Sequence, residues 1–507
     1  MVHSRYPRRV DVAIVGSGPA GAAYARILSE QAPHATIAVF EAGPVVSDPP
    51  GAHVRNIADP GQRARAQRRS EGPRPHTAAS PADPLDDYAA DRERLVRPGT
   101  FLLPDGWRQP GEDGLPAAAM SSNAGGMAAH WTGACPRPGG SERIPFVPDL
   151  DRLLTEAERL LGVSAKVLAD APLAGEVRAR LGAALDAGRP EDRRVQPMPL
   201  AVRRTADGRL VWSGSDVVFG EVTRTNPNFG LFDESVVTRV LLRDGAVRGV
   251  TVRDLTTGAE HEVAASSVVV AADSLRTPQL LHASGVRLPA LGRYLNDQPQ
   301  VVLAVRLRDV PAAPEADPAD GGITARSGVS WVPFTDEHPF HGQVMQLDAS
   351  PVPIEGDPPA PGSIVGLGWF CAKDLQAGDR VAFSDTETDH HGLPALRIHY
   401  TLTARDRDNL RAAREAIVEA AHALGDVLDP EPLTFPPGAS LHYQGTVRMG
   451  PADDGTSVCD PASRVWGVRG LHVAGNGVIP TATACNPTLT AVALAVAGAR
   501  ALAADLA

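Results

Sequence analysis

The first forty residues constrain the fold of this chain more than any other segment. Residues 10–15 (VDVAIV) form an apolar run typical of a buried strand, and the glycine-rich turn GSGPAG follows directly. Residues 22–31 have the composition of a helix, and residues 35–40 (ATIAVF) that of a second strand, which ends at Glu41. A strand, glycine turn, helix and strand in this order predict a dinucleotide-binding βαβ unit.

Each glycine of this turn has a physical role in such a unit. Gly16 permits the tight turn, Gly18 lets the backbone approach a pyrophosphate, and Gly21 lets helix and strand pack closely. The phosphate charge is stabilised at the helix N-terminus. Glu41 follows Gly21 by twenty residues, where a carboxylate binds ribose hydroxyls. This unit alone does not distinguish NAD from FAD. The alternative to a dinucleotide site is a glycine turn with a purely structural role.

Two further segments have unusual compositions. Residues 121–138 (SSNAGGMAAHWTGACPRP) are too rich in glycine for a regular element and too apolar for a linker, which suits a backbone lying flat against a planar ligand. Residues 470–475 predict a strand, and residues 487–503 predict a helix rich in Ala, Leu and Val. Pro487 suits the first helical turn. Asn486 then stands at the helix start, either as a cap or facing a ligand.

Composition limits the classes of function. A chain of 507 residues favours two domains around one cleft, and 43% hydrophobic with 21% charged residues is typical of a soluble globular protein. The net charge of −11 argues against a nucleic-acid surface. We find no apolar stretch approaching the ~20 residues that span a bilayer, and no signal sequence. The four cysteines lack CxxC spacing, so we expect a reduced, cytoplasmic protein without disulfides or a metal site.

Five segments resemble the glucose–methanol–choline (GMC) oxidoreductase superfamily, and within it the pyranose oxidase branch. They are GAHVRN (51–56), GGMAAHWT (125–132), FSDTETD (383–389), HYQGTVRMG (442–450) and NPTLT (486–490). The similarity runs from the fingerprint to the last helix. The resemblance implies FAD as cofactor and oxidation of a secondary hydroxyl, at C-2 or C-3, of a pyranose sugar or glycoside. The branch also contains bacterial enzymes that oxidise C-glycosides at C-3.

The resemblance also implies roles for particular residues. His442 matches the catalytic histidine, Asn486 its partner, and Thr132 the threonine near the reactive flavin nitrogen. His130 falls where fungal pyranose oxidases attach the flavin, but alanines replace the Ser-Thr pair before it, which puts a covalent link in doubt. The candidate cofactor-binding residues are Gly16, Gly18, Gly21, Glu41, Gly125, Gly126, Met127, His130, Trp131, Thr132, Asn476, Pro487 and Thr488.

Alcohol oxidation explains why a histidine suits this position. The reaction removes a proton from oxygen and a hydride from carbon, and an imidazole with a pKa near neutrality suits the first task. We therefore expect His442 to act as base and Asn486 to orient the hydroxyl. A GMC oxidoreductase of a non-sugar alcohol and a redox-silent flavin-containing lyase are the alternatives. The electron acceptor is oxygen or a quinone, and the oligomeric state stays open.

The predicted fold is of mixed α/β class. A Rossmann-like FAD-binding domain comprises residues 1–150, 210–298 and 455–507, and a discontinuous substrate-binding domain on an antiparallel or mixed sheet comprises residues 151–209 and 299–454. Within them we expect antiparallel strands at 235–242, 246–255 and 260–264, a buried parallel strand at 267–272, and helices at 277–284 and 406–424. The chain is shorter than fungal relatives between 348 and 365, which implies an open site that favours larger glycosides.

Overall fold

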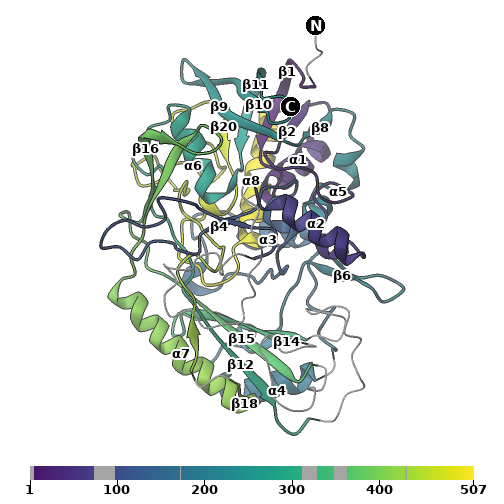
Figure 1. Cartoon of the computed structure of the whole chain (residues 1–507), viewed down its shortest axis with the longest axis vertical. Helices are drawn as coiled ribbons and strands as arrows, with labels where there is room; N and C mark the ends of the chain where they lie inside the picture. Colours follow the sequence, from purple (N-terminus) through teal and green to yellow (C-terminus); the bar gives the residue numbers. More distant parts are fainter. Residues whose placement is uncertain (1–4, 73–96, 172, 311–327, 348–361, 429–430) are drawn as a thin grey trace.

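The computed structural model describes residues 5–72, 97–171, 173–310, 328–347, 362–428 and 431–507. The described chain is built around two large sheets, one at each end of the molecule (Figure 1). Helices α1, α5 and α8 accompany the first sheet, and the long helix α7 lies along the second. The mixed α/β class is as predicted.

The first sheet contains the predicted βαβ unit. Its strand order is β8-β2-β1-β11-β10-β9, and β20 pairs with β11. The central strand β1 runs parallel to both β2 and β11, and the helix between β1 and β2 is α1 (Pro19–Gln31). The strands are β1 (Arg9–Val15), β2 (Ile37–Phe40), β8 (Phe229–Phe232), β9 (Ser235–Arg243), β10 (Ala246–Asp254), β11 (Glu260–Val270) and β20 (Leu471–Val473).

One strand corrects the sequence prediction. We expected separate strands at 260–264 and 267–272, whereas β11 is continuous from Glu260 to Val270. Its first half pairs antiparallel with β10, and its second half pairs parallel with β1 and β20. Burial alternates along the first half and becomes continuous in the second. The burial pattern changes where the strand enters the core, because both of its faces are covered there. The strand continues through this point because it contains no glycine or proline.

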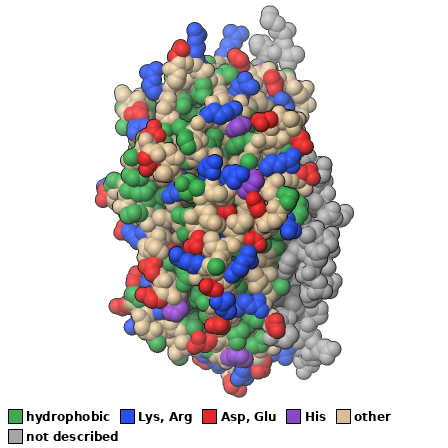
Figure 2. Space-filling model, turned by 90° about the vertical axis from the view of Figure 1, so that its left-hand side faces the viewer, with side chains coloured by type: hydrophobic (Ala, Val, Ile, Leu, Met, Phe, Trp, Pro, Cys, Tyr) green, Lys and Arg blue, Asp and Glu red, His purple; other side chains and the backbone are tan. Residues whose placement is uncertain are grey.

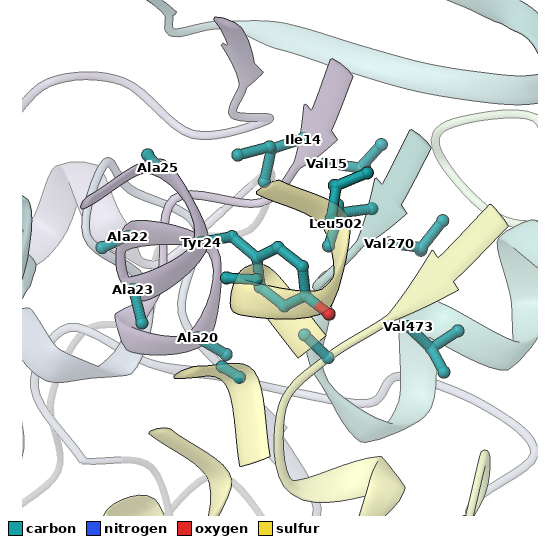
Figure 3. Close-up of a cluster of buried hydrophobic side chains, with 14 of the residues drawn as sticks. Ile14, Val15, Ala20, Ala22, Ala23, Tyr24, Ala25, Val270, Val473 and Leu502 are labelled. Carbon is teal, nitrogen blue, oxygen red and sulfur yellow. The ribbon is translucent and has the colours of Figure 1, made fainter. Parts of the chain in front are cut away.

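Four helices pack together beside this sheet: α1, α3 (Leu150–Leu161), α5 (Ser215–Arg224) and α8 (Thr488–Leu506). The Tyr24 ring of α1 lies among side chains of the sheet and of α8, including Val270, Val473 and Leu502 (Figure 3). We expected residues 151–161 in the substrate-binding domain, but α3 packs against α8 and α5, because its apolar residues belong to this core.

Helix α8 also corrects the expectation about long apolar segments. By length and composition it is long and apolar enough to cross a membrane, and it is mostly buried inside the protein. The core helix of a soluble protein passes the same test.

The second sheet has the order β18-β12-β15-β14-β13-β5, and β19 pairs with β12. Alternate residues of a strand point to opposite faces. Val365, Leu367 and Trp369 of β15 pack in the core beneath α7 (Ala404–Leu424), so Phe370 faces the other way. The strands are β5 (Gln196–Pro197), β12 (Gln300–Leu307), β13 (Val329–Val332), β14 (Phe340–Leu347), β15 (Ile364–Cys371), β18 (Gly425–Val427) and β19 (Leu433–Thr434).

Shorter elements join and flank the two sheets. They are α2 (Pro60–Ser70), α4 (Ala174–Leu185), α6 (Asp273–Ala283), β3 (Phe101–Leu102), β4 (Ala119–Met120), β6 (Val202–Arg204), β7 (Leu210–Trp212), β16 (Arg380–Thr388) and β17 (Pro394–His399), with 3-10 turns η1 (Val54–Asn56), η3 (Gly126–Ala129), η4 (Gly140–Glu142), η5 (Glu191–Arg193) and η7 (Asn476–Val478). The four cysteines are buried and free. On the face shown in Figure 2, basic and acidic side chains are interspersed.

Candidate active site

The glycine-rich turn combines close packing with one open position. A Cβ added to Gly16, which has a φ of +98°, would lie 2.4 Å from the Ala271 carbonyl oxygen, and one added to Gly21 would lie 2.1 Å from the Gly16 oxygen. A Cβ on Gly18 would meet nothing within 4 Å in the described part of the chain. Gly18 also begins α1 without a side-chain cap. The turn therefore has room for a ligand beside free backbone N–H groups, which suits a pyrophosphate.

Glu41 connects the end of β2 to this turn. Its Oε2 accepts hydrogen bonds from the Ser17 backbone N–H (3.0 Å) and hydroxyl (2.7 Å), and its Oε1 accepts one from the Gly43 N–H (2.9 Å). The Ser17 oxygen in turn accepts a bond from the Gly125 N–H at 2.8 Å. Burial raises the pKa of Glu41, and the bonds to Gly43 and Ser17 oppose that rise. The predicted ribose-binding carboxylate and the glycine-rich segment at 125 are thus physically connected.

The segment around η3 lies directly against the turn. A Cβ on Gly126 would lie 3.3 Å from the Gly18 Cα, and one on Gly125 would lie 2.7 Å from the Gly51 Cα. Only glycines allow backbones to approach so closely. Trp131 donates its indole N–H to the Ser213 carbonyl, and its own carbonyl lies 2.8 Å from His53 Nε2. The sequence analysis gave His53 no role, yet it holds this segment.

His130 lies in the same segment with one ring nitrogen unused. Its Nε2 is 3.3 Å from the Asn123 side-chain oxygen, and its Nδ1 has no hydrogen-bond partner in the described chain. Burial lowers the pKa of His130 to about 4, so the ring is neutral near pH 7. Met127 and His130 are half-buried, and Thr132 is exposed.

His442 and Asn486 face each other, although 44 positions separate them in the chain. Asn486 Nδ2 lies 3.3 Å from His442 Nε2, and Asn486 Oδ1 accepts a bond from Gln343 Nε2 at 2.7 Å. The other ring nitrogen, His442 Nδ1, lies 2.7 Å from Gln298 Oε1. The Phe370 ring of β15 approaches the imidazole with centroids 5.6 Å apart. Residues from both halves of the fold therefore surround the histidine.

The loop before His442 is held by a buried carboxylate. Asp297 accepts hydrogen bonds from the Gly438 N–H and the Ser440 hydroxyl, and the Ser440 oxygen accepts the His442 N–H at 3.0 Å. Leu441 has a φ of 62°, a left-handed conformation that is costly for a leucine. The contacts of Asp297 and Ser440 stabilise this bend, which directs His442 toward Asn486.

A second buried carboxylate holds the loop before Asn486. Glu142 Oε1 accepts the N–H groups of Ala484 and Cys485, both at 2.8 Å, and its Oε2 accepts the Gly139 N–H. Asn486 does not cap α8, since its side chain is bonded to Gln343 and the helix has no side-chain cap. Pro487 stands at the N-cap, one position earlier than the first-turn position we expected.

Burial lowers the pKa of His442 to about 3, and the positive charge of Arg97 lowers it further. The pKa therefore lies below the near-neutral value that we expected, and the imidazole is neutral near pH 7 with one ring nitrogen unprotonated.

These residues fit a flavin adenine dinucleotide. The uncapped N-termini of α1 and α8 offer backbone N–H groups, and Thr490, in the first turn of α8, has a buried hydroxyl with no partner in the described chain. Asn476 begins η7, which contacts α8. Gly16 to Gly21 and Glu41 suit the adenosine and phosphate half, and residues 125–132, Asn476, Pro487 and Thr488 suit the flavin half.

Comparison with known families decides the class of this site. The GMC oxidoreductase family matches the chain over residues 149–300 and 379–495. The chain belongs to the GMC oxidoreductase family. It is 64% identical to the C-glycoside 3-oxidase of Arthrobacter globiformis, over 100% of this chain and 97% of that protein, and 32% identical to the pyranose 2-oxidase of Tricholoma matsutake, over 97% and 93%.

A solved structure shares the fold of this GMC oxidoreductase. The crystal structure of pyridoxine 4-oxidase from Mesorbium loti superposes with a TM-score of 0.67 at 21% identity, over 97% of this chain and 99% of that one. The predicted family and cofactor are confirmed: the protein is an FAD-dependent oxidoreductase that acts on a CH–OH donor.

Glu142, Gln298 and Gln343, like His53 and Asp297 above, were not singled out in the sequence of this GMC oxidoreductase. Each lies far along the chain from the residue that it holds. A signal did exist for Gln298, because residues 296–300 (NDQPQ) are a polar run directly before an apolar strand. Such a run buried at a strand start requires partners.

Proposed function

We propose that this GMC oxidoreductase oxidises the C-3 hydroxyl of glycosides, C-glycosides included, to the keto sugar. The observation that carries the proposal is the pairing of His442 and Asn486 in a chain 64% identical, over its whole length, to proteins named C-glycoside 3-oxidase. Similarity to pyranose 2-oxidases supports a sugar as the substrate class. The non-sugar alcohol and the redox-silent lyase are not favoured by these relatives.

His442 supplies the base in this proposal. Its unprotonated Nε2 accepts the hydroxyl proton, and Asn486, whose NH₂ lies 3.3 Å from that nitrogen in the protein without substrate, donates to the substrate oxygen instead and orients it. Bound FAD would supply the acceptor for the hydride of the carbinol carbon. The Phe370 ring lies against the imidazole and limits the access of water to it.

The electron acceptor is proposed to be oxygen or a quinone, and the location cytoplasmic. The chain was expected to be shorter than fungal pyranose oxidases between 348 and 365, and residues 348–361 of that segment lie outside the described residues. The expectation of an open site that admits bulky aglycones remains a proposal, and substrate comparison tests it.

The first experiment records the visible spectrum of the FAD-loaded protein without oxygen. We expect a C-glycoside to bleach the oxidised flavin band faster than glucose does, with a product carrying its carbonyl at C-3. Bleaching by glucose alone, with a C-2 ketone as product, would replace this proposal with pyranose 2-oxidation. A flavin that no sugar or glycoside reduces contradicts sugar oxidation altogether. Oxygen and a quinone are then compared as oxidants of the reduced enzyme.

His442→Ala tests the base directly. Removal of a positioned base typically costs a factor of ~10²–10⁴ in rate, so we expect flavin reduction by substrate to slow by that order while FAD content is retained. Stopped-flow absorbance under anaerobic conditions gives the rate. His34→Ala is the control, because His34 is exposed and lies 3.3 Å from the Leu506 carbonyl, without contact to the reacting pair. A parental rate in the His442 variant would falsify the assignment.

A further inference from the structure

We propose that Gln298 is the positioning residue of the reacting pair: its one amide sets the tautomer of His442 and the distance between His442 and Asn486. The inference rests on the proposed function of His442 as base. Gln298 is 1% exposed, stands within the polar run at 296–300, and bonds the two loops that carry the pair. Gln444, two residues after His442, also joins the loops through the Thr483 hydroxyl, whereas Gln298 bonds both the His442 ring and the Asn486 loop.

The orientation of the Gln298 amide follows from its partners. Its Nε2 lies 2.9 Å from the Thr483 carbonyl oxygen and 2.8 Å from the Cys485 carbonyl oxygen. Carbonyl oxygens only accept hydrogen bonds, so the atom between them must be the NH₂ group. The opposite atom of the amide is then the oxygen, and it lies 2.7 Å from His442 Nδ1.

This orientation dictates the tautomer of the histidine. An amide oxygen has no hydrogen to donate, so His442 Nδ1 must carry the proton. A neutral imidazole has one N–H, and Nε2 is therefore the nitrogen with the free lone pair. Gln343 orients Asn486 in the same manner, since its NH₂ binds Asn486 Oδ1 and turns the asparagine NH₂ toward His442 Nε2. In this series of side-chain amides, each N–H group therefore faces an atom that can accept its hydrogen bond.

The same amide also sets the spacing of the pair. Cys485 immediately precedes Asn486, and Gln298 holds the carbonyls of Cys485 and Thr483 while it holds the imidazole. Gln298 is itself fixed by its neighbours, because the Asn296 backbone pairs with Gln444 and the Asp297 side chain binds the Ser440 loop. Movement of either loop would therefore break a bond to Gln298.

Two substitutions separate these effects. Gln298→Met keeps the approximate volume but removes both sets of bonds, so Nε2–H and Nδ1–H tautomers of His442 interconvert. We expect flavin reduction at saturating glycoside to slow about 10- to 100-fold, as for other groups that orient an imidazole, with FAD content retained. Gln298→Glu keeps an acceptor for Nδ1–H, but its second oxygen faces the carbonyls of Thr483 and Cys485 and can bond to them only when the carboxyl is protonated. We expect this variant to retain the Nδ1–H tautomer and to reduce its flavin faster than Gln298→Met, with a rate that falls as the pH rises and the carboxyl ionises.

The experiment measures three quantities on the FAD-loaded enzymes. The first is the rate of flavin reduction as a function of pH. The second is the dependence of that rate on substrate concentration, which separates the limiting rate from the apparent substrate affinity. The third is the ¹⁵N chemical shift of each His442 ring nitrogen, assigned by its loss in His442→Ala. Gln279→Met is the matched control, because Gln279 is equally buried and hydrogen-bonded, to Asp389 and the Pro394 carbonyl, without contact to either loop.

The outcomes are distinct. A protonated Nδ1 in the parent, lost in Gln298→Met together with rate and kept in Gln298→Glu, supports the inference. A protonated Nε2 in the parent, or a parental rate and an unchanged tautomer in Gln298→Met, overturns it. If His442→Ala retains the parental rate, the proposed function fails instead, whatever the tautomer.

Discussion

Neutral amides, rather than charged groups, contact the reacting pair. Gln298 and Gln343 bind His442 and Asn486, whereas the buried carboxylates Asp297 and Glu142 bind backbone N–H groups one step away. A carboxylate on the imidazole would favour its protonated form and so lower the fraction of the ring that is free to accept a proton. An amide orients the ring without adding that charge. The arrangement thus separates the task of holding the loops from that of holding the histidine.

A second buried histidine allows a test of burial itself. His341 is fully buried, and neither of its ring nitrogens has a partner in the described chain. Burial lowers the pKa of His341 to about 3 from 6.5, with a smaller contribution from His442. The unfolded chain therefore takes up a proton first as the pH falls. The stability associated with the neutral ring is complete above pH 6.5 and is lost as the pH falls toward 3.

His341→Leu removes this pH dependence. On going from about pH 7.5 to about pH 5, we expect the variant to gain ~2 kcal/mol of unfolding free energy relative to the parent, because 1.4 kcal/mol corresponds to each pH unit below the unfolded pKa. Urea unfolding at the two pH values measures it. An equal difference between variant and parent at both values would show that His341 titrates normally in the folded protein.

Elements pack in this protein through contacts that depend on small residues. Gly498 lies in α8 opposite Tyr24 of α1, and a Cβ on Gly498 would lie 2.0 Å from the Tyr24 hydroxyl oxygen. The glycine lowers the helix propensity of α8 by ~1 kcal/mol. It also lets the two helices that flank the dinucleotide site pack closely, around the ring shown in Figure 3.

Helix propensity alone predicts that Gly498→Ala stabilises the protein, but the packing predicts the opposite. We expect it to destabilise the protein by ~1–3 kcal/mol through overpacking, measured by urea unfolding. Gly175→Ala in α4 is the matched control, because a Cβ there would meet nothing within 4 Å among the described residues, and we expect it to be neutral or stabilising by up to ~1 kcal/mol. Combining Gly498→Ala with Tyr24→Phe should restore part of the loss. Equal stabilisation by both glycine substitutions would contradict the packing argument.

At the scale of the whole molecule, the reacting pair lies where the two halves of the fold meet. Asn486 leads into α8 of the first core, whereas Gln343 and Phe370 belong to the second sheet. The glycine-rich turn at residues 16–21 lies against the segment at 125–126, so the candidate dinucleotide site is connected to the segment that suits the flavin. Binding of FAD at this site should stabilise the folded protein, since a ligand that binds only the native state shifts the folding equilibrium.

Gly18→Ala tests that linkage. A Cβ at this position has free space in the protein itself, so we expect the FAD-free variant to melt at the parental temperature. With FAD present, its gain in melting temperature should be smaller than that of the parent, because the methyl group occupies the place of the phosphates. In Gly21→Ala, by contrast, the Cβ would clash with the Gly16 oxygen, and the FAD-free protein itself should melt earlier. An undiminished FAD effect in Gly18→Ala would place the dinucleotide elsewhere.

Local pattern was sufficient for much of this architecture. The fingerprint turn, the antiparallel set β9, β10 and β11, and the helices α6, α7 and α8 follow from periodicity and turn chemistry within short windows. Motif resemblance then identified the family, and it named His442 and Asn486, which the structure brings within hydrogen-bonding distance. These features are local because each depends on residues that are neighbours in the chain.

Only the tertiary structure decided how the pair is held. The continuity of β11, the packing of α3 with α8, and the contacts of Gln298, Gln343 and Glu142 all join segments that lie far apart in sequence. A glutamine gives no periodic signal of its own, and its role depends on which carbonyls and ring nitrogens the fold places around it. The residues proposed to carry the chemistry could therefore be predicted from the sequence, whereas the residues that orient them could be identified only in the tertiary structure.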